Sequence, residues 1–430
     1  MRQFLYITPF FPPQSQVGSL RPLKFVRHLP ALGWQPVVLC DQGRPDQQDP
    51  GLTDFVPRGA IVVRDYSPRA QLAQWQQRHR GTPTPEPAQN RPRPQRWSER
   101  ALPSWLANPE LLPLGEHAVD IPYAIWSAKR TLRRYPKCEA ILVNADPYAA
   151  CLVGAELKRE TGLPLLLDLR DPWAPCQLRR PRRPLPMRWL EDRLERLCVE
   201  TADRVILNTY NTMHDYRSHY PDIEAQRFTC IRNHFDADLV RHGSHAGFDR
   251  YTLLFLGRFE RFNKADVLLQ ILAELKRRGV TPEELQLVVT GDFPDPAWTM
   301  AKGLGVADFV HLHPFVPYRE IGPVLDAADL LVALVGPGVT QRINAKLYDY
   351  LGADRPVLAI SDNPEIAEMV HAARAGMTFG HDEIAQIADH VQRELKKGRQ
   401  RSVPRRSAGL SSQEATAELV QLLETVTRRR

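Results

Sequence analysis

Short apolar runs alternate with amphipathic stretches throughout the first half of the chain. Runs of four to seven apolar residues have the length and composition of buried strands, and the stretches between them carry apolar residues at helical spacing. Strand followed by helix and strand again predicts a parallel sheet with helical crossovers. The predicted strands are residues 4–8, 33–40, 140–144, 164–169 and 204–209, and the predicted helices are 20–32, 148–161 and 187–202.

The second half of the chain repeats this pattern after a polar, glycine-containing segment at residues 236–250. Predicted strands are 251–257, 285–291, 309–316, 329–335 and 356–361, and predicted helices are 265–279, 321–328 and 344–353. A capping box at Ser411 and Glu414 opens a final helix over 411–426. We therefore expect two α/β domains, residues 1–240 and 241–405, and a C-terminal segment, 406–430, whose helix docks on one of them.

Composition supports a globular protein that contains no membrane-spanning helix. The 430 residues are 43% hydrophobic and 25% charged, and no apolar run approaches the length of a membrane-spanning helix. The six cysteines are scattered, which predicts reduced thiols and a cytoplasmic protein. Residues 67–113 contain nine prolines and three tryptophans, so they predict an insertion without regular structure, or an acceptor-binding or membrane-facing lid.

Positive charge gathers between residues 179 and 197, where the sequence RRPRRP precedes an amphipathic helix. One interpretation is a solvated face of the protein. The other is peripheral contact with anionic lipid at the inner face of the cell membrane, because clustered cations beside Trp189 suit such a surface.

The second half also carries a candidate phosphate site. Gly257 ends a predicted strand, and Arg258 and Lys264 flank the loop before the next helix. Cations beside a helix N-terminus can neutralise a diphosphate. A Gly-Pro-Gly turn later precedes a helix with Lys346 and Asp349, a carboxylate placed to accept hydrogen bonds from two ribose hydroxyls. The alternative to a phosphate site is that Arg258 and Lys264 are ordinary solvated cations and that Asp349 is a surface carboxylate favoured by the helix dipole.

Seven motifs, in order along nearly the whole chain, resemble those of one family. They are FFPP with the following GS, LDLRDPW, ADRVILNT, IRNHFD, LGRFERFNK, VVTGDFP and KLYDYLGADRPVLA. The chain resembles the retaining glycosyltransferases of group 1 (family 4) with the GT-B fold. The resemblance implies two Rossmann-like domains with parallel sheets facing an inter-domain cleft, and a C-terminal helix that returns to the N-terminal domain. The C-terminal domain would bind a nucleotide-sugar donor, and the N-terminal domain would bind the acceptor.

The resemblance implies donor-binding residues. Arg258 and Lys264 match the cations that bind the donor diphosphate and stabilise the leaving group, and Asp349 matches the carboxylate that binds the ribose. Two positions depart from the family pattern, because Gln341 and Asp349 stand where many members have glutamates. The donor-binding set is Gly18, Ser19, Gly257, Arg258, Lys264, Gln341, Lys346, Leu347 and Asp349.

In the N-terminal half, Asp171 matches a polar residue near the reacting carbon and is expected to position the sugar or the acceptor. Arg21, Arg170 and Trp173 are the expected acceptor contacts. The bland alternatives are that Asp171 caps a turn or pairs with Arg170, and that Trp173 is core. We expect no metal and no cofactor, because cations replace the metal at the diphosphate; the donor would be a substrate such as a UDP- or GDP-sugar.

The sequence thus predicts sugar transfer with retention to a glycan or lipid-linked acceptor in surface polysaccharide or glycoconjugate biosynthesis, and it predicts no nucleic-acid partner. Two alternatives keep the fold: a nucleotide-sugar epimerase, and a degenerate GT-B protein that binds without turnover. No short motif fixes the donor base, the sugar, the acceptor, the linkage or the oligomeric state.

Overall fold

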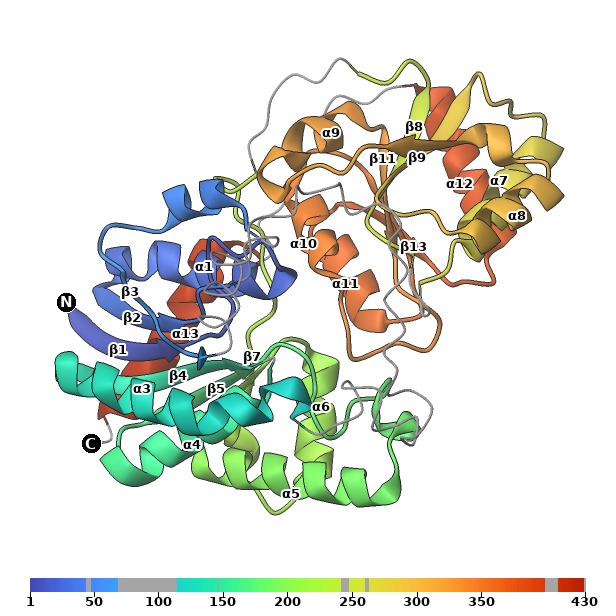
Figure 1. Cartoon of the computed structure of the whole chain (residues 1–430). Coiled ribbons are helices and arrows are strands. Elements are labelled where there is room, and N and C mark those ends of the chain that lie inside the picture. Colours follow the sequence, from blue (N-terminus) through green and yellow to red (C-terminus); the bar gives the residue numbers. More distant parts are fainter. Residues whose placement is uncertain are drawn as a thin grey trace, which may run out of the picture. The chain divides into compact units, whose positions relative to one another are not determined.

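The computed structural model describes residues 1–43, 48–68, 114–145, 147–240, 247–259, 263–398 and 409–428. The chain forms two compact units, Met1–Arg232 with Gln413–Arg430, and Asn233–Ser412 (Figure 1). These limits lie a few residues from the boundaries predicted at 240 and 406. The Pro-rich segment predicted at 67–113 lies outside the described residues except for Ser67 and Pro68.

The first unit contains a parallel sheet of seven strands in the order β3-β2-β1-β4-β5-β6-β7. The strands are β1 (Arg2–Ile7), β2 (Trp34–Cys40), β3 (Ile61–Arg64), β4 (Cys138–Ala145), β5 (Leu165–Leu169), β6 (Arg204–Leu207) and β7 (Phe228–Cys230). Its helices are α1 (Val17–His28), α3 (Ile121–Arg134), α4 (Ala149–Thr161), α5 (Leu185–Thr201), α6 (Tyr210–His219) and α13 (Ser412–Arg428).

Alternation along β1 shows how this sheet divides its core between two faces. Leu5 and Ile7 pack in the cluster that contains residues of α3, α4 and α5, whereas Phe4 and Tyr6 pack in the cluster that contains residues of α1 and α13. Successive side chains of a strand point to opposite faces, so a strand covered on both sides reads as a continuous apolar run. The terminal helix α13 contributes Ala415, Leu419, Leu423 and Val426 to the second cluster, which confirms that it returns to the first unit.

The second unit contains a parallel sheet of six strands in the order β10-β9-β8-β11-β12-β13. The strands are β8 (Tyr251–Leu256), β9 (Leu285–Thr290), β10 (Val310–His313), β11 (Leu330–Leu334), β12 (Val357–Ile360) and β13 (Gly376–Phe379). Its helices are α7 (Asp266–Arg277), α8 (Asp295–Gly303), α9 (Ile321–Ala327), α10 (Ala345–Gly352), α11 (Pro364–Ala372) and α12 (Ile384–Lys397).

Both sheets share a strand order that reverses direction next to the first strand of the unit. In the first unit the reversal lies between β1 and β4, and in the second it lies between β8 and β11. Open α/β sheets bind ligands outside the carboxyl ends of the strands at such a switch point. The predicted class of two parallel α/β units is therefore confirmed, and the loops after β1, β4, β8 and β11 become the places to look for sites. No helix in the described ranges is long and apolar enough to cross a lipid bilayer.

Candidate functional site

The loop after β8 begins at a glycine that the geometry requires. Gly257 has a φ of +125°, and a Cβ built on it would lie 1.6 Å from the Nζ atom of Lys346. The ammonium group of Lys346, on the first turn of α10, therefore lies directly over the end of β8. A side chain at position 257 would have to displace this cation, which explains the glycine in physical terms.

Two further cations follow Gly257 along the chain. The side chains of Arg258 and Lys264 are exposed, and neither has an ion pair or hydrogen bond among the residues that the structure describes. Lys264 stands two residues before the N-terminus of α7, where helix N–H groups also favour an anion. The Lys346 ammonium thus lies at the end of β8, and Arg258 and Lys264 are exposed on the loop that follows; we call these three side chains the cation cluster. Their binding of a diphosphate stays a prediction.

Three asparagines that the sequence analysis did not single out fix the loop after β11. Asn263 accepts a hydrogen bond from the Gly336 N–H at 2.8 Å, so it links the loops after β8 and β11. Asn344 donates to the Leu334 carbonyl at 2.7 Å, and Asn363 donates to the Thr340 carbonyl at 3.0 Å. The sequence signal for such residues is an amide side chain beside a turn, which is common and carries little specificity.

Asp349 is nearly buried, with 7% of its surface exposed, and it accepts a hydrogen bond from the Tyr318 phenol at 2.7 Å. Burial, together with the charge of Asp349, raises the pKa of Tyr318, so the phenol stays a donor at neutral pH. Gln341 is equally buried, at 7% exposed. The ribose contact of Asp349 remains a prediction. Leu347, predicted to bind the donor, has a fully buried side chain, and its N–H donates to the Asn344 carbonyl at 3.0 Å, so neither group fits a donor contact in this structure.

In the first unit, the loop after β1 is packed more tightly than predicted. The hydroxyl of Ser19 is buried and donates to the Gln14 and Gln16 carbonyls, each at 2.7 Å, and its N–H is bonded to Gln16 as well. The predicted contact of Ser19 with a donor is therefore corrected to a structural role. A Cβ on Gly18 would lie 2.9 Å from the Phe10 ring, so the group that packs closely against Gly18 in this structure is Phe10. The contact of Gly18 with a donor stays a prediction.

Two of the predicted acceptor contacts are buried. Arg21 is 3% exposed; it donates to both oxygens of Asp168, the shortest distance being 2.8 Å, and to the Ile231 carbonyl at 2.9 Å. Trp173 is fully buried and stacks on Tyr148 with ring centroids 5.0 Å apart. Both predictions of an acceptor contact are corrected. Arg21 joins α1 to the end of β5, and Trp173 is a core residue, which was the alternative interpretation of this tryptophan.

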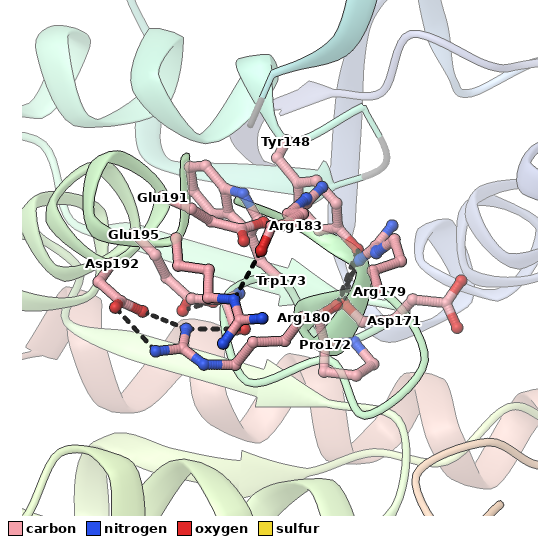
Figure 2. A network of polar contacts seen from close by, with 12 residues as sticks. Tyr148, Asp171, Pro172, Trp173, Arg179, Arg180, Arg183, Glu191, Asp192 and Glu195 are labelled. Carbon is pink, nitrogen blue, oxygen red and sulfur yellow. Dashed lines mark hydrogen bonds and ion pairs between the residues drawn. The ribbon is translucent and has the colours of Figure 1, made fainter. Parts of the chain in front are cut away.

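Arg170 and Asp171 are the predicted residues that stay at the surface of the first unit. Their side chains are each less than one-fifth exposed and form an ion pair at 3.4 Å. Figure 2 shows the Asp171 carboxylate pointing away from the arginines of the loop that follows. The ion pair between Asp171 and Arg170, which is one of the alternatives to a positioning role, is thus observed. The positioning role of Asp171 stays a prediction.

Arginines of the RRPRRP stretch, one interpretation of which is contact with anionic lipid, hold the loop between β5 and α5 in place (Figure 2). Arg179 donates to the Tyr148 hydroxyl and the Pro172 carbonyl, and Arg180 forms two hydrogen bonds with Asp192 at 2.6 and 2.9 Å. Arg183 pairs with Glu191, and both side chains are buried. These three arginines therefore bind groups within the protein, and Arg182 is the exposed arginine of the RRPRRP stretch.

Glu195 on α5 also binds the loop between β5 and α5. Its carboxylate is fully buried and accepts hydrogen bonds from the Tyr216 hydroxyl, from the Tyr220 hydroxyl at 2.8 Å and from the Ala174 N–H at 3.1 Å. Burial raises the pKa of Glu195 to about 7, although the two tyrosines oppose this shift. The folded protein therefore binds a proton at Glu195 more tightly than the unfolded chain does.

This difference predicts pH-dependent stability. The stabilisation from Glu195 is fully present below pH 4.5 and is lost as the pH rises through 7, which amounts to about 3 kcal/mol at most. Urea unfolding of the wild type and Glu195→Gln between pH 5 and 8 measures it, because glutamine does not titrate. Glu200→Gln, on an exposed position of the same helix, is the control. Equal pH slopes for the wild type and Glu195→Gln would contradict the assignment.

Comparison with known proteins decides the family of the second unit. Residues 250–397 match the family model described as Glycosyl transferases group 1. The second unit is a group 1 glycosyltransferase domain. The D-inositol 3-phosphate glycosyltransferase of Frankia alni is 27% identical over 227 residues, which are 48% of this chain and 54% of that protein. The chain spans about half the length of the curated relatives it matches.

Solved structures extend the comparison to the fold of the whole chain. Sucrose-phosphate synthase from Thermosynechococcus elongatus has a TM-score of 0.63 at 13% identity, with 100% of each chain covered. The Anabaena protein HepE in complex with UDP has a TM-score of 0.56 at 13% identity, covering 100% of this chain and 98% of that one. The two sheets and the returning helix thus have the GT-B arrangement of elements.

The group 1 domain contains the cation cluster at the end of β8. Gly257, Arg258, Lys264, Lys346 and Asp349 all lie within the matched residues, and the candidates of the first unit all precede them. Within the described part of the chain, no three histidine, cysteine or acidic side chains gather to hold a metal ion.

Proposed function

We propose that this protein transfers a sugar from a nucleotide-sugar donor, bound by the group 1 domain, to a hydroxyl group of an acceptor bound by the first unit. The observation that carries the proposal is the set of cations after β8. The Lys346 ammonium lies over Gly257, and the side chains of Arg258 and Lys264 are exposed on the loop that follows. Three cations suit the two charges on the diphosphate of a nucleotide sugar and the further charge that the diphosphate gains as it leaves. HepE, a structural neighbour, was crystallised with UDP, which fits a UDP-sugar donor.

In the proposed reaction, the bond between the sugar carbon and the diphosphate oxygen breaks, and the electron pair leaves with the diphosphate. Arg258 and Lys264 stabilise the charge that develops there, which is electrostatic catalysis by preorganised groups. The acceptor hydroxyl attacks on the face that the diphosphate leaves, so the configuration is retained, and its proton passes to a diphosphate oxygen. Asp171 positions the sugar or the acceptor, and the reaction needs orientation more than a strong base.

We propose an acceptor of glycan or lipid-linked type, used in surface polysaccharide or glycoconjugate biosynthesis. The similar proteins named D-inositol 3-phosphate glycosyltransferases make a phosphorylated polyol a further candidate. A degenerate binding protein is the second candidate function, because Gln341 brings no charge where many related enzymes have glutamate.

Donor turnover tests the proposal. The protein is incubated with UDP-, GDP-, ADP- and dTDP-sugars in the presence of EDTA, and released nucleotide and free sugar are measured. We expect slow hydrolysis of one donor class without metal, because Arg258 and Lys264 supply the positive charge. Binding without hydrolysis would support the degenerate protein, and an epimerised sugar would support the epimerase; either result would contradict sugar transfer.

The proposal includes reversible membrane contact, with the contact surface moved from the arginines to an exposed face of α5. Leu185 is 75% exposed and Trp189 is 59% exposed, and the Arg193 guanidinium lies 4.6 Å from the Trp189 ring centre. Leu197 continues the same face. Apolar side chains interleaved with arginines are the composition that binds an anionic lipid interface.

Vesicle co-sedimentation tests this surface. Leu185→Ser combined with Trp189→Ser is expected to lower binding to phosphatidylglycerol-containing vesicles about tenfold, because both apolar anchors are removed. Leu32→Ser, an exposed leucine elsewhere in the first unit, is the matched control and should bind like the wild type. If the double variant also binds like the wild type, α5 does not contact lipid.

A further inference from the structure

A cluster of half-buried side chains lies at the switch point of the first sheet, on the loop after β1 and around it. Phe10 and Arg170 border Gly18, His117 packs against Phe10, and the buried Asp120 pairs with His117. His117 and Asp120 belong to no motif, and Phe10, although it opens the FFPP motif, has no expected role of its own. Their chemistry differs from that of the cation cluster in the second unit, because an aromatic ring stands beside a histidine and an arginine that are each paired with an aspartate.

Phe10 is the centre of this cluster. Its ring meets the His117 ring edge-on, with centroids 6.3 Å apart and an angle of 82° between the planes. A Cβ on Gly18 would lie 2.9 Å from Cδ2 of Phe10 and 3.1 Å from Nη1 of Arg170, so the ring and the guanidinium flank one point of the backbone. Phe10 itself is only partly buried, so part of it is exposed at the carboxyl end of the sheet.

Asp120 orients His117. The Nδ1 atom of His117 lies 3.5 Å from Oδ2 of Asp120, and the Ser67 hydroxyl donates to the other oxygen of Asp120 at 2.7 Å. Asp120 is 1% exposed, whereas the His117 side chain is 22% exposed. A carboxylate at Nδ1 favours the proton on that nitrogen, which makes Nε2 the acceptor nitrogen of the neutral ring.

We propose that this cluster binds the acceptor as a sugar or polyol ring, with Phe10 against the C–H face of the ring and His117 accepting a hydrogen bond from one of its hydroxyls. Such a ring has an apolar face and a rim of hydroxyls, and the cluster offers an aromatic face with polar groups beside it. Arg170, paired with Asp171, supplies a donor next to Gly18, beside the Phe10 ring. The proposal rests on the proposed function and adds the acceptor class and the residues that contact it.

Ligand-observed saturation-transfer NMR with the full chain tests the cluster. The probes are D-glucose, D-mannose, myo-inositol and D-inositol 3-phosphate. We expect at least one probe to receive saturation from the wild type, and the signal to fall at least about fivefold in His117→Ala and in Phe10→Leu, which keeps an apolar side chain beside Gly18. His214→Ala, an exposed histidine on α6, is the control and should match the wild type.

Two outcomes would overturn the inference: no probe is saturated by the wild type, or the signal persists in both His117→Ala and Phe10→Leu. Thermal stabilisation by UDP and GDP is measured on the same variants. It should equal that of the wild type, because the nucleotide belongs to the second unit. Probe binding without any nucleotide stabilisation would contradict the proposed donor site and leave the acceptor cluster standing, so the two failures are distinguishable.

Discussion

Replacing Lys264 with alanine is expected to lower kcat/KM for sugar transfer by a factor of about 100 to 1,000. Removing one preorganised group that stabilises developing charge typically costs this much. Lys264 is exposed just before α7, so its ammonium group is available to the leaving diphosphate and supports no part of the core. Initial rates with the donor identified in the nucleotide-sugar panel measure the effect, and the midpoint of thermal unfolding should stay within about 1 °C.

Lys302→Ala is the matched control, because Lys302 is an exposed lysine on α8 of the same unit. Its rate should equal that of the wild type, which separates a local effect from a change in net charge. A Lys264→Ala variant that retains more than about one-third of the wild-type rate would show that this lysine does not contact the diphosphate.

Replacing Glu191 with alanine is expected to cost about 3 to 5 kcal/mol of unfolding free energy. Glu191 and Arg183 are both buried and pair with each other, so the substitution leaves a buried guanidinium without its counter-charge. Urea unfolding of the purified variants measures the loss. Because Arg183 lies in the loop just before Pro184, the N-cap of α5, we expect this loop to be the first part to become accessible to protease.

The double variant Arg183→Met with Glu191→Leu is the informative partner of this experiment. Replacing a buried ion pair by apolar side chains of similar volume is often neutral, so most of the lost stability should return. Arg182→Ala removes the exposed neighbouring arginine and should change the stability by less than about 0.5 kcal/mol. If Glu191→Ala and Arg182→Ala cost the same, the buried pair contributes nothing specific.

The order of elements could be predicted because strands covered on both faces leave continuous apolar runs. Residues 4–7 and 140–143 are fully buried in the structure, and their runs are unambiguous in the sequence. The edge strands β3, β7 and β13 were missed. β7 and β13 leave no run of four apolar residues, and the run at residues 60–63 that opens β3 was overlooked. The strand predicted to reach residue 316 ends at His313, before Pro314.

None of the candidate cations of the second unit is corrected by the structure, whereas Ser19, Arg21 and Trp173 of the first unit are. Arg258 and Lys264 follow one strand on one loop, so local spacing in the sequence reports them, whereas Lys346 comes from α10 and meets Gly257 only in the fold. Arg21 looked like an acceptor contact because its partner Asp168 lies 147 residues away, and no local pattern shows such a pair. His117 was not predicted because its neighbour Phe10 is remote in sequence, and because its nearby partner Asp120 is a carboxylate like many others.

The central claim is that the second unit binds a nucleoside diphosphate at the end of β8. Thermal unfolding of the wild type, Lys264→Ala and Lys302→Ala with UDP, GDP, ADP and dTDP tests it most directly. Ligand at about 100 times its Kd adds about 2.7 kcal/mol, so one nucleotide should raise the unfolding midpoint of the wild type and Lys302→Ala by about 5 °C or more. Lys264→Ala should lose most of that shift. A wild type that no nucleotide stabilises would contradict the account.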